Sequence, residues 1–332
     1  MKSNITSTIL TFSVLFAGAA TAQSFDSAGT TGTTTTQPYA YTANLSGNNV
    51  SVVNTATNTL VTTISVGQSP IGIVLSPDSS TLYVACQGGK QVSIISTALN
   101  KVIATVPLTA GPSAAALSPN GAQLYVTEPT ANLVSIIDTA SKSVIGSVAV
   151  GTKPNGVAFS PDGLRAYVSN QSSSSVFVID TTNMSVLLTF TTGSGPSGIA
   201  VTPDGTKVLV TNQDSNTVTV HDATSGVLLQ TMSGFTYPNS ITLSPTGDRA
   251  YVTNGNASTL SVIDTNVSTV IATVTTGSSV MPTAVALNAA GTRAYVTNEM
   301  GMSLSVVDTT KNALVTTILR AGVYPVGVAV GH

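Results

Sequence analysis

Short stretches rich in apolar residues recur along the chain from residue 39 onward. One unit contains four of them, at 154–159, 166–170, 176–180 and 186–192. Val, Ile, Thr and Tyr fill these stretches, whereas Pro-Asp-Gly, Asn and Ser-rich segments separate them, which is typical of β-strands joined by tight turns. No segment keeps a helical period over about 11 residues. The pattern therefore predicts units of four short strands and an all-β fold.

One four-residue phrase marks the repeat. It first stands at Tyr41-Thr42-Ala43-Asn44 and returns with its first residue at Tyr83, Tyr125, Tyr167, Leu209, Tyr251 and Tyr295. The spacing is 42 residues five times and then 44. Four-stranded units in blocks of about 40 residues are typical of β-propellers. We therefore predict a seven-bladed β-propeller of four-stranded antiparallel blades over residues 39–332.

The two ends of the repeat region predict how the ring closes. The region opens on a second strand of a unit, at 39–44, and finishes on a first strand, at 326–330. We expect the C-terminal strand to complete the N-terminal blade. Pairing the two ends in one sheet removes the open edges that would otherwise invite association.

Several phrases resemble the YVTN-repeat family of β-propellers. The phrase stands intact at 251–254 and 295–298, and Ser160-Pro161-Asp162-Gly163 and Val262-Ile263-Asp264-Thr265 are also similar to the family pattern. The resemblance extends over residues 39–332 and implies the propeller fold. It implies no single activity, because the group resembles a mixture of surface-layer proteins, periplasmic binding proteins and lactonase relatives. The absence of Trp contrasts with WD-repeat propellers.

The N-terminal residues predict export. Lys2 precedes an apolar run over 9–20, and Ala20-Thr21-Ala22 is a small-x-small cleavage pattern, so residues 1–22 are predicted to be a signal peptide. An uncleaved anchor is the alternative, but the run is short for a membrane span. Residues 23–38, rich in Thr, Gly and Ser, are predicted to be a flexible leader. We expect an exported protein that is periplasmic or extracellular, including the cell surface. No later stretch reaches the length of apolar sequence that a membrane helix needs, so no transmembrane segment is expected in the mature chain.

Charge narrows the classes of partner. Only 7% of residues are charged, with 11 Lys and Arg against 13 Asp and Glu. Binding of single-stranded nucleic acid needs a positive groove and stacking aromatic residues. The scattered basic residues and the absence of Trp disfavour that function.

Comparison of the repeats separates structural residues from candidate sites. A residue type that the blade needs recurs at the equivalent position of several units. By this criterion eight aspartates are predicted to support turns by accepting backbone hydrogen bonds, namely Asp138, Asp180, Asp222, Asp264, Asp308, Asp78, Asp162 and Asp204. Turn support in left-handed conformations is predicted for Asn170, Asn212, Asn254 and Asn298.

The central channel is where a propeller enzyme gathers its chemistry. The position after the loop proline starts each inner strand and holds Ile71, Ser113, Asn155, Ser197, Asn239, Thr283 and Val326. Metal sites and acid–base chemistry need carboxylates, His or Cys, and this position has none. We therefore predict no catalytic residue, no metal site and no cofactor. Cys86 and Glu128 replace the Asn of the phrase in neighbouring units. A catalytic thiol is not predicted there, because a nearby carboxylate raises the pKa of a thiol and suppresses its reactivity.

Two candidate surfaces emerge at opposite ends of the predicted blades. Aromatic residues and Met favour partner contacts, and the candidate binding face on the loops comprises Phe235, Tyr237, Met281, Tyr324, Glu128, Asn155 and Asn239. Alternatively, its aromatic residues pack together as a small hydrophobic core that fills the channel mouth. A candidate basic arc comprises Arg165, Lys207, Arg249 and Arg293. Alternatively, the basic residues form local ion pairs, since Asp162 and Asp204 lie three residues before Arg165 and Lys207.

The sequence thus favours a noncatalytic secreted or periplasmic scaffold whose loop face binds a protein, glycan or small ligand. A lactonase-like propeller hydrolase is the first alternative and rests on the family resemblance alone. Binding of single-stranded nucleic acid is the second.

Overall fold

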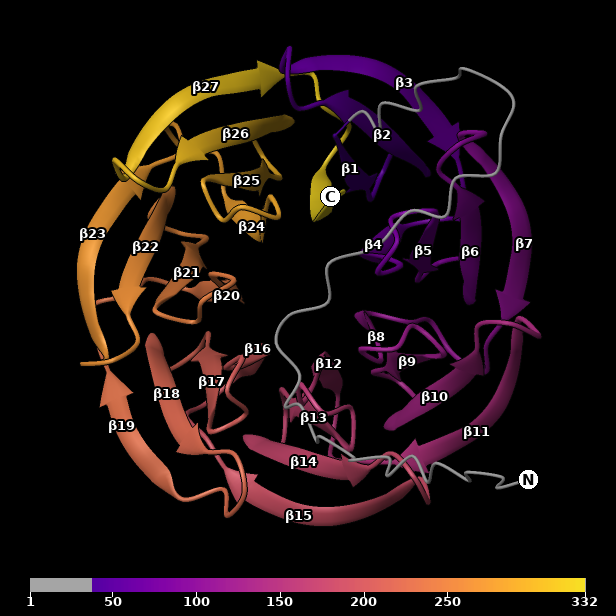
Figure 1. The fold of residues 1–332 in the computed structure, drawn as a ribbon, viewed down its shortest axis with the longest axis vertical. Helices are drawn as coiled ribbons and strands as arrows, with labels where there is room; N and C mark the ends of the chain where they lie inside the picture. Colours follow the sequence, from indigo (N-terminus) through magenta and orange to yellow (C-terminus); the bar gives the residue numbers. More distant parts are fainter. Residues whose placement is uncertain (1–37, 332) are drawn as a thin grey trace, which may run out of the picture. The chain divides into compact units, whose positions relative to one another are not determined.

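The computed structural model describes residues 38–331, which form 28 strands in seven four-stranded antiparallel sheets around a central axis (Figure 1). No helix occurs among these residues. The predicted seven-bladed, all-β propeller is therefore confirmed. The predicted signal peptide (1–22) and, apart from Pro38, the predicted leader (23–38) lie outside the described residues.

Each sheet is one blade, and its strands follow one another from the axis outward. Blade 1 comprises β28 (Pro325–Val330), β1 (Tyr39–Asn44), β2 (Asn49–Asn54) and β3 (Thr59–Ser65). Blade 2 comprises β4 (Pro70–Leu75), β5 (Thr81–Cys86), β6 (Gln91–Ser96) and β7 (Lys101–Pro107). Blade 3 comprises β8 (Ala115–Leu117), β9 (Gln123–Glu128), β10 (Leu133–Asp138) and β11 (Ser143–Ala149). Blades 4 and 5 comprise β12 (Pro154–Phe159), β13 (Arg165–Asn170), β14 (Ser175–Asp180) and β15 (Ser185–Thr191); and β16 (Pro196–Val201), β17 (Lys207–Asn212), β18 (Thr217–Asp222) and β19 (Leu228–Met232). Blades 6 and 7 comprise β20 (Pro238–Leu243), β21 (Arg249–Asn254), β22 (Thr259–Asp264) and β23 (Thr269–Thr275); and β24 (Pro282–Leu287), β25 (Arg293–Asn298), β26 (Ser303–Asp308) and β27 (Ala313–Leu319).

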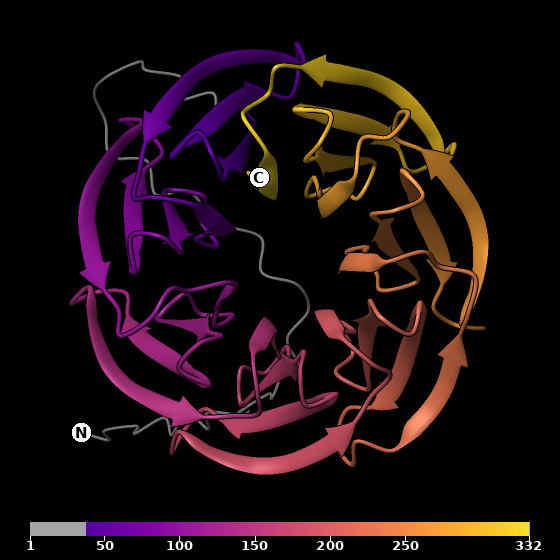
Figure 2. The same cartoon turned by 180° about the vertical axis from the view of Figure 1, so that it is seen from behind.

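The ring closes within blade 1. The C-terminal strand β28 pairs antiparallel with β1, from Ala40 opposite Val330 to Asn44 opposite Pro325. Figure 2 shows this last strand at the axis, beside the N-terminal strands of the same blade. The predicted completion of the N-terminal blade by the C-terminal strand is confirmed.

The hydrophobic core lies between adjacent blades. In one of its clusters Tyr125 and Ile136 of blade 3 pack with Val168 and Ile179 of blade 4, and all four side chains are fully buried. Equivalent clusters recur around the ring. Burial of such side chains stabilises the fold by about 1.5–3 kcal/mol each, so the propeller needs no disulfide.

The third residue of the repeated phrase joins neighbouring blades. The Thr127 hydroxyl accepts a hydrogen bond from the Ala114 amide and donates one to the Asn155 carbonyl of blade 4, both at 2.9 Å. Ser169 makes the same pair of contacts and reaches the Ser197 carbonyl of blade 5 at 2.6 Å. The preference for Thr or Ser at this position therefore has a physical cause: one hydroxyl satisfies two buried backbone groups.

The Asn that ends the phrase has a different role from the one predicted. Asn170, Asn212, Asn254 and Asn298 are buried at strand ends and lack positive φ angles, so left-handed turn support is wrong. The Asn170 amide donates to the Val168 and Ser175 carbonyls, whereas the other three amides reach across the sheet to hydroxyls of the third strand. Asn254 Nδ2 donates to Ser261 Oγ at 2.8 Å, and Asn298 Nδ2 donates to Ser305 Oγ at 2.8 Å. These bonds hold the second and third strands together beside the loop face.

The outer strands expose adjacent apolar side chains. In blade 1 the register shifts opposite Val52 and Val53, so that Val61 is an extra residue of β3. Leu60 and Val61 consequently both face outward and are 44% and 50% exposed. Irregular edge strands resist pairing with other strands, and the same register shift occurs in every blade.

Candidate functional site

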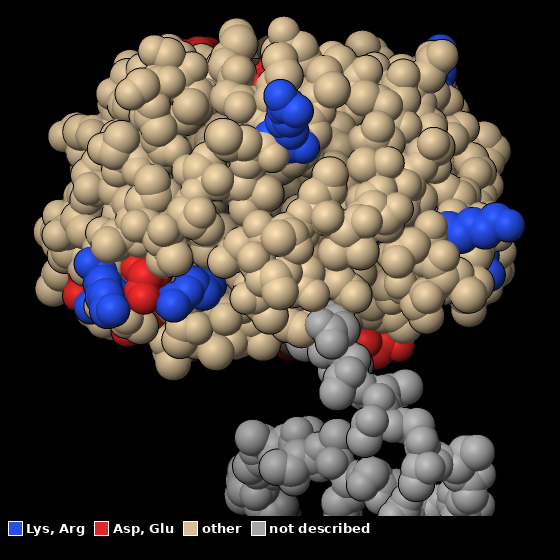
Figure 3. Space-filling view, turned by 90° about the horizontal axis from the view of Figure 1, so that it is seen from above, with Lys and Arg blue, Asp and Glu red and all other residues tan. Residues whose placement is uncertain are grey.

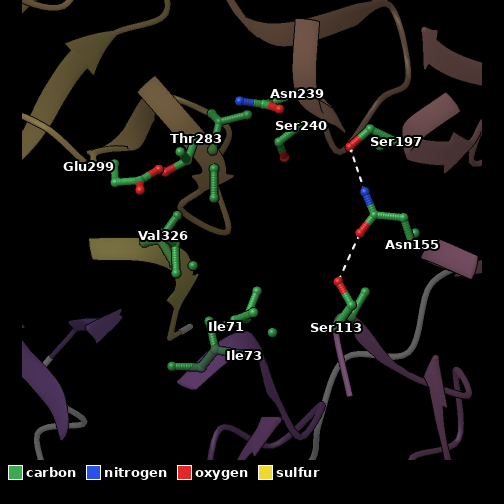
Figure 4. A pocket seen from close by; sticks show the side chains of 18 of the residues that line it. Ile71, Ile73, Ser113, Asn155, Ser197, Asn239, Ser240, Thr283, Glu299 and Val326 are labelled. Atoms are coloured by element: carbon green, nitrogen blue, oxygen red, sulfur yellow. Dashed lines mark hydrogen bonds between the residues drawn. The ribbon is translucent and has the colours of Figure 1, made fainter. Parts of the chain in front are cut away.

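The candidate site is a cavity of about 400 Å³ at the loop end of the central channel. Inner strands of all seven blades line it, and the predicted channel position supplies Ile71, Ser113, Asn155, Ser197, Asn239, Thr283 and Val326. Figure 4 shows these side chains around one space. The structure thus brings together the residues that the repeat analysis placed at the channel.

The cavity wall has an apolar side and a polar side. Ile71 and Ile73 of blade 2 and Val326 of blade 1 form the apolar side. On the polar side the Ser113 hydroxyl donates to Asn155 Oδ1 at 2.8 Å, and Asn155 Nδ2 donates to Ser197 Oγ at 3.0 Å (Figure 4). These bonds orient three neutral side chains from blades 3 to 5 along the wall.

A second series of amides continues this polar side at the mouth. Gln171 Nε2 donates to Gln213 Oε1 at 2.9 Å, and Gln213 Nε2 donates in turn to Asn239 Oδ1. The acceptor oxygen of Asn239 is therefore occupied. Within residues 38–331 no hydrogen-bond acceptor is paired with Asn239 Nδ2, so this amide can donate to a ligand.

Glu299 is the one carboxylate among the residues that line the cavity. It follows β25 and is half-buried, and its amide donates to the Met281 carbonyl at 3.0 Å. Burial raises the pKa of its side chain above the ordinary glutamate value. In the described part of the chain its carboxylate has no ion pair and no side-chain hydrogen bond. The sequence reasoning missed Glu299, although its departure from Gln171 and Gln213 at the equivalent position was a usable signal.

Tyr237 and Met281 line the cavity mouth from the loops before β20 and β24. Both adopt left-handed backbone conformations, with φ angles of 55° and 52°, which are uncommon for large side chains. The Tyr237 amide donates to Asn216 Oδ1 at 2.7 Å, and its carbonyl accepts from the Gly255 amide at 3.0 Å. Bonds on both sides therefore fix the backbone that carries the ring.

Two members of the predicted binding face are placed elsewhere. Phe235 is 5% exposed and packs in the core with Met232 and Ile241, so it is part of the core instead of a contact surface. Glu128 is fully buried, where its carboxylate accepts hydrogen bonds from the Ala110 amide and the Ser135 hydroxyl. A binding role for Phe235 and Glu128 is therefore wrong.

The remaining members of that face divide into two groups. Tyr237, Met281, Asn155 and Asn239 lie together around the cavity. Tyr324 is half-buried ahead of β28 and does not belong to the residues that line the cavity. Four of the seven candidates thus share one site.

The basic arc lies at the opposite end of the blades, where Arg165, Lys207, Arg249 and Arg293 each begin a second strand. Arg249 pairs with Asp264, and Arg293 pairs with Asp308, each at 2.8 Å. Arg165 and Lys207 reach backbone carbonyls of the next blade instead, at 3.3 Å. In the described residues neither forms an ion pair with Asp162 or Asp204, although the charge of each basic residue contributes to the lowered pKa of that aspartate, behind its hydrogen bonds.

The surface around the ring carries little charge. Figure 3 shows that Lys, Arg, Asp and Glu cover only a few separate areas of this side. The aspartates at strand ends act as predicted; for example, Asp138 Oδ1 accepts from the Ser141 amide at 2.7 Å. Hydrogen bonds from the Ser141 side chain and amide lower the pKa of Asp138.

Cys86 and His221 are both buried in blade cores. Burial raises the pKa of the Cys86 thiol and lowers that of the His221 imidazole. Across residues 38–331 no group of three or more His, Cys, Asp or Glu side chains is placed to hold a metal ion. No helix in this same part of the chain is long and apolar enough to span a membrane.

Comparison with protein families and known proteins adds the following findings. The model of the choice-of-anchor I domain matches residues 115–328. No curated protein matches. Among solved structures, the chain is similar to hydrazine synthase of Kuenenia stuttgartiensis, with 23% identity and a TM-score of 0.70 over 78% of this chain and 88% of that chain. It is also similar to a functionally unknown protein from Desulfotomaculum acetoxidans DSM 771, with 18% identity and a TM-score of 0.79 over 89% and 99% of the two chains. At these identities the likeness shows a shared propeller fold and carries no activity.

Proposed function

The chain belongs to the choice-of-anchor I domain family, and from this premise we propose that it is a surface-associated, noncatalytic propeller that binds a ligand through its loop face. The family name describes attachment to a cell surface, which agrees with the exported protein that the N-terminal residues predict. Membership of the YVTN-repeat family stays a resemblance.

The observation that carries the proposal is the cavity at the channel mouth. Ligand sites are concave, and they combine apolar walls with a few oriented polar groups. Here Ile71 and Val326 supply an apolar wall, whereas Asn155 bridges two serines on the opposite wall. Hydrogen bonds among the polar side chains hold them in place before a ligand arrives, and such preorganisation reduces the cost of binding.

The composition of the wall supports binding over catalysis. A hydrolase needs a general base or a metal-activated water beside the scissile bond. Glu299 is the one ionisable group of this kind in the cavity lining, and no His, Lys or second carboxylate lines the cavity with it. The groups that do line the cavity recognise a ligand by hydrogen bonding and apolar contact.

The proposal is tested by thermal-shift measurements on the purified protein with fractionated envelope components, namely small molecules, glycans and peptides. A ligand at 100 times its Kd stabilises the folded state by about 2.7 kcal/mol. We expect at least one fraction to raise the melting temperature of the wild type but not of Asn239→Ala. Lys207→Gln, on the other face, should respond like the wild type.

Three results would contradict the proposal. Metal-dependent turnover of lactones would show a hydrolase instead. Salt-sensitive binding of single-stranded oligonucleotides would show the nucleic-acid function that the charge disfavours. An equal response of wild type and Asn239→Ala to every stabilising fraction would place the binding surface away from the channel.

A further inference from the structure

We propose that the cavity binds a neutral sugar residue on the side formed by blades 6 and 7, where Tyr237, Asn239 and Glu299 contact it. This inference rests on the proposed function, since it names the ligand class of the same cavity. It follows from three features: departures from the repeat, an opening at Gly255, and the balance of free hydrogen-bonding groups.

Blades 6 and 7 differ from blades 2, 4 and 5 at two positions beside the cavity. The position before the loop proline holds Ser69, Lys153 and Gly195 in blades 2, 4 and 5, but Tyr237 and Met281 in blades 6 and 7. The position after the phrase holds Gln87, Gln171 and Gln213 in blades 2, 4 and 5, but Gly255 and Glu299 in blades 6 and 7. Blade 1 has Tyr324 and Leu45 at these two positions, and blade 3 has Gly111 and Pro129. Because blades 2, 4 and 5 fold with a small or basic residue at the first position and Gln at the second, the scaffold does not require the residues of blades 6 and 7.

Gly255 keeps the space beside the aromatic ring open. A Cβ atom at this residue would lie 3.2 Å from Cδ1 of Tyr237 and 3.1 Å from Nδ2 of Asn239. Both distances are shorter than ordinary van der Waals contacts. A longer side chain, such as the Gln of blades 2, 4 and 5, would therefore crowd the ring and the free amide. The glycine leaves both groups accessible from the cavity mouth.

The free hydrogen-bonding groups include both donors and acceptors. Asn239 Nδ2 only donates, the Glu299 carboxylate only accepts when it is ionised, and Ser197 Oγ, which accepts from Asn155, still has its own proton to donate. A sugar hydroxyl both donates and accepts, so the hydroxyls of a sugar can pair with donors and with an acceptor of the wall. An ammonium ligand would satisfy Glu299 but would offer no acceptor to Asn239.

Two further properties favour a sugar over other neutral ligands. A pyranose has an apolar face of C–H groups, which matches the Tyr237 ring and Val326 of the neighbouring blade 1. The cavity volume of about 400 Å³ falls within the usual range for small-ligand sites. Anionic sugars are disfavoured, because the Glu299 carboxylate would repel a second carboxylate.

The test is isothermal titration calorimetry of the full chain with glucose, galactose, N-acetylglucosamine and their β-linked tetramers. Glucuronate and glucosamine serve as the anionic and cationic controls. We expect one-to-one binding of at least one neutral sugar and at least tenfold weaker binding of its anionic counterpart, where tenfold corresponds to about 1.4 kcal/mol.

Two variants assign the binding to this part of the cavity. Gly255→Gln and Glu299→Gln both introduce the residue that blades 2, 4 and 5 already carry, and circular dichroism should show that both variants are folded. The melting temperature of Glu299→Gln should stay close to that of the wild type, whereas Gly255→Gln should lower it slightly because its side chain crowds Tyr237 and Asn239. Each should weaken sugar binding at least about tenfold. Lys207→Gln, at the far end of the blades, is the matched control and should bind like the wild type.

The inference is overturned if no neutral sugar binds at about 10 mM, a concentration at which even a millimolar Kd gives a clear signal. It is also overturned if glucosamine binds more tightly than glucose, or if both Gln variants bind the sugar like the wild type. A stabilising non-sugar ligand that depends on Asn239, together with no sugar binding, would refute the sugar class and leave the proposed binding function intact.

Discussion

Thr211 Oγ1 donates a hydrogen bond of 2.8 Å to the carbonyl oxygen of Asn239, the residue that carries the free amide of the cavity. The same hydroxyl accepts a hydrogen bond of 2.8 Å from the Gly198 amide. One fully buried side chain therefore links β17 of blade 5 to the inner strands of blades 5 and 6. Stability and the candidate site share this contact.

Thr211→Val should destabilise the protein and weaken ligand binding. Valine keeps the shape of threonine but leaves the Gly198 amide and the Asn239 carbonyl without their partner, which costs about 1–3 kcal/mol for a buried group. Urea unfolding followed by circular dichroism measures the loss. Thr211→Ser is the matched control, because Ser169 makes the same contacts in blade 4. Equal stability of the Val and Ser variants would contradict this role.

Deletion of residues 325–332 should abolish cooperative unfolding. The deletion removes β28, so β1 keeps β2 but loses its inner antiparallel partner, and the inner strands of blades 7 and 2 lose a neighbour. An open ring exposes sheet edges and core surface together. Differential scanning calorimetry should show a broad transition in place of a single sharp one. A truncated protein that melts like the full chain would refute closure by this strand as the source of cooperativity.

His221→Ile should reduce the loss of stability at mildly acidic pH. Burial lowers the pKa of folded His221 below its ordinary value of 6.5. Below pH 6.5 the unfolded chain therefore binds a proton that the folded chain excludes, and stability falls as the pH drops toward the folded pKa. Above pH 6.5 this penalty is absent. Isoleucine stands at the equivalent position of blade 4, as Ile179, and carries no proton.

Melting temperatures at pH 7.5 and 5.0 measure this effect. The wild type should lose more stability between the two values than His221→Ile. The raised pKa of Glu299 acts in the opposite direction, since it favours the folded state at low pH, but it is common to both proteins. Equal losses in the two proteins would show that His221 does not cause the acid sensitivity.

Cys86 should be unreactive in the folded protein and dispensable for ligand binding. Its side chain is fully buried, and burial raises the thiol pKa, so little thiolate forms. The thiol reagent DTNB at pH 8 should label the protein only after denaturation. Cys86→Ser should keep the ligand response of the wild type. Rapid labelling of the folded protein, or loss of binding by a folded Ser variant, would contradict this prediction.

Repetition made much of the fold and part of the site predictable. The spacing of the phrase fixed the number of blades, and the proline of each inner strand located the ring of side chains that includes Asn155 and Asn239. The same logic failed for Phe235, whose loop position looked accessible. The loop folds inward, and its ring packs against Met232 and Ile241. Contacts of this kind join residues of different strands and leave no periodic trace in the chain.

The sequence by itself determined the seven blades, the order of strands within each blade and the closure of the ring, because each of these depends on local strand and turn patterns that repeat. Only the tertiary structure decided which departures from the repeat act together. Tyr237, Gly255 and Glu299 stand in two different blades and look like separate substitutions along the chain. Closing the ring brings the loops of blades 6 and 7 to one end of the channel, where these residues lie beside the same cavity.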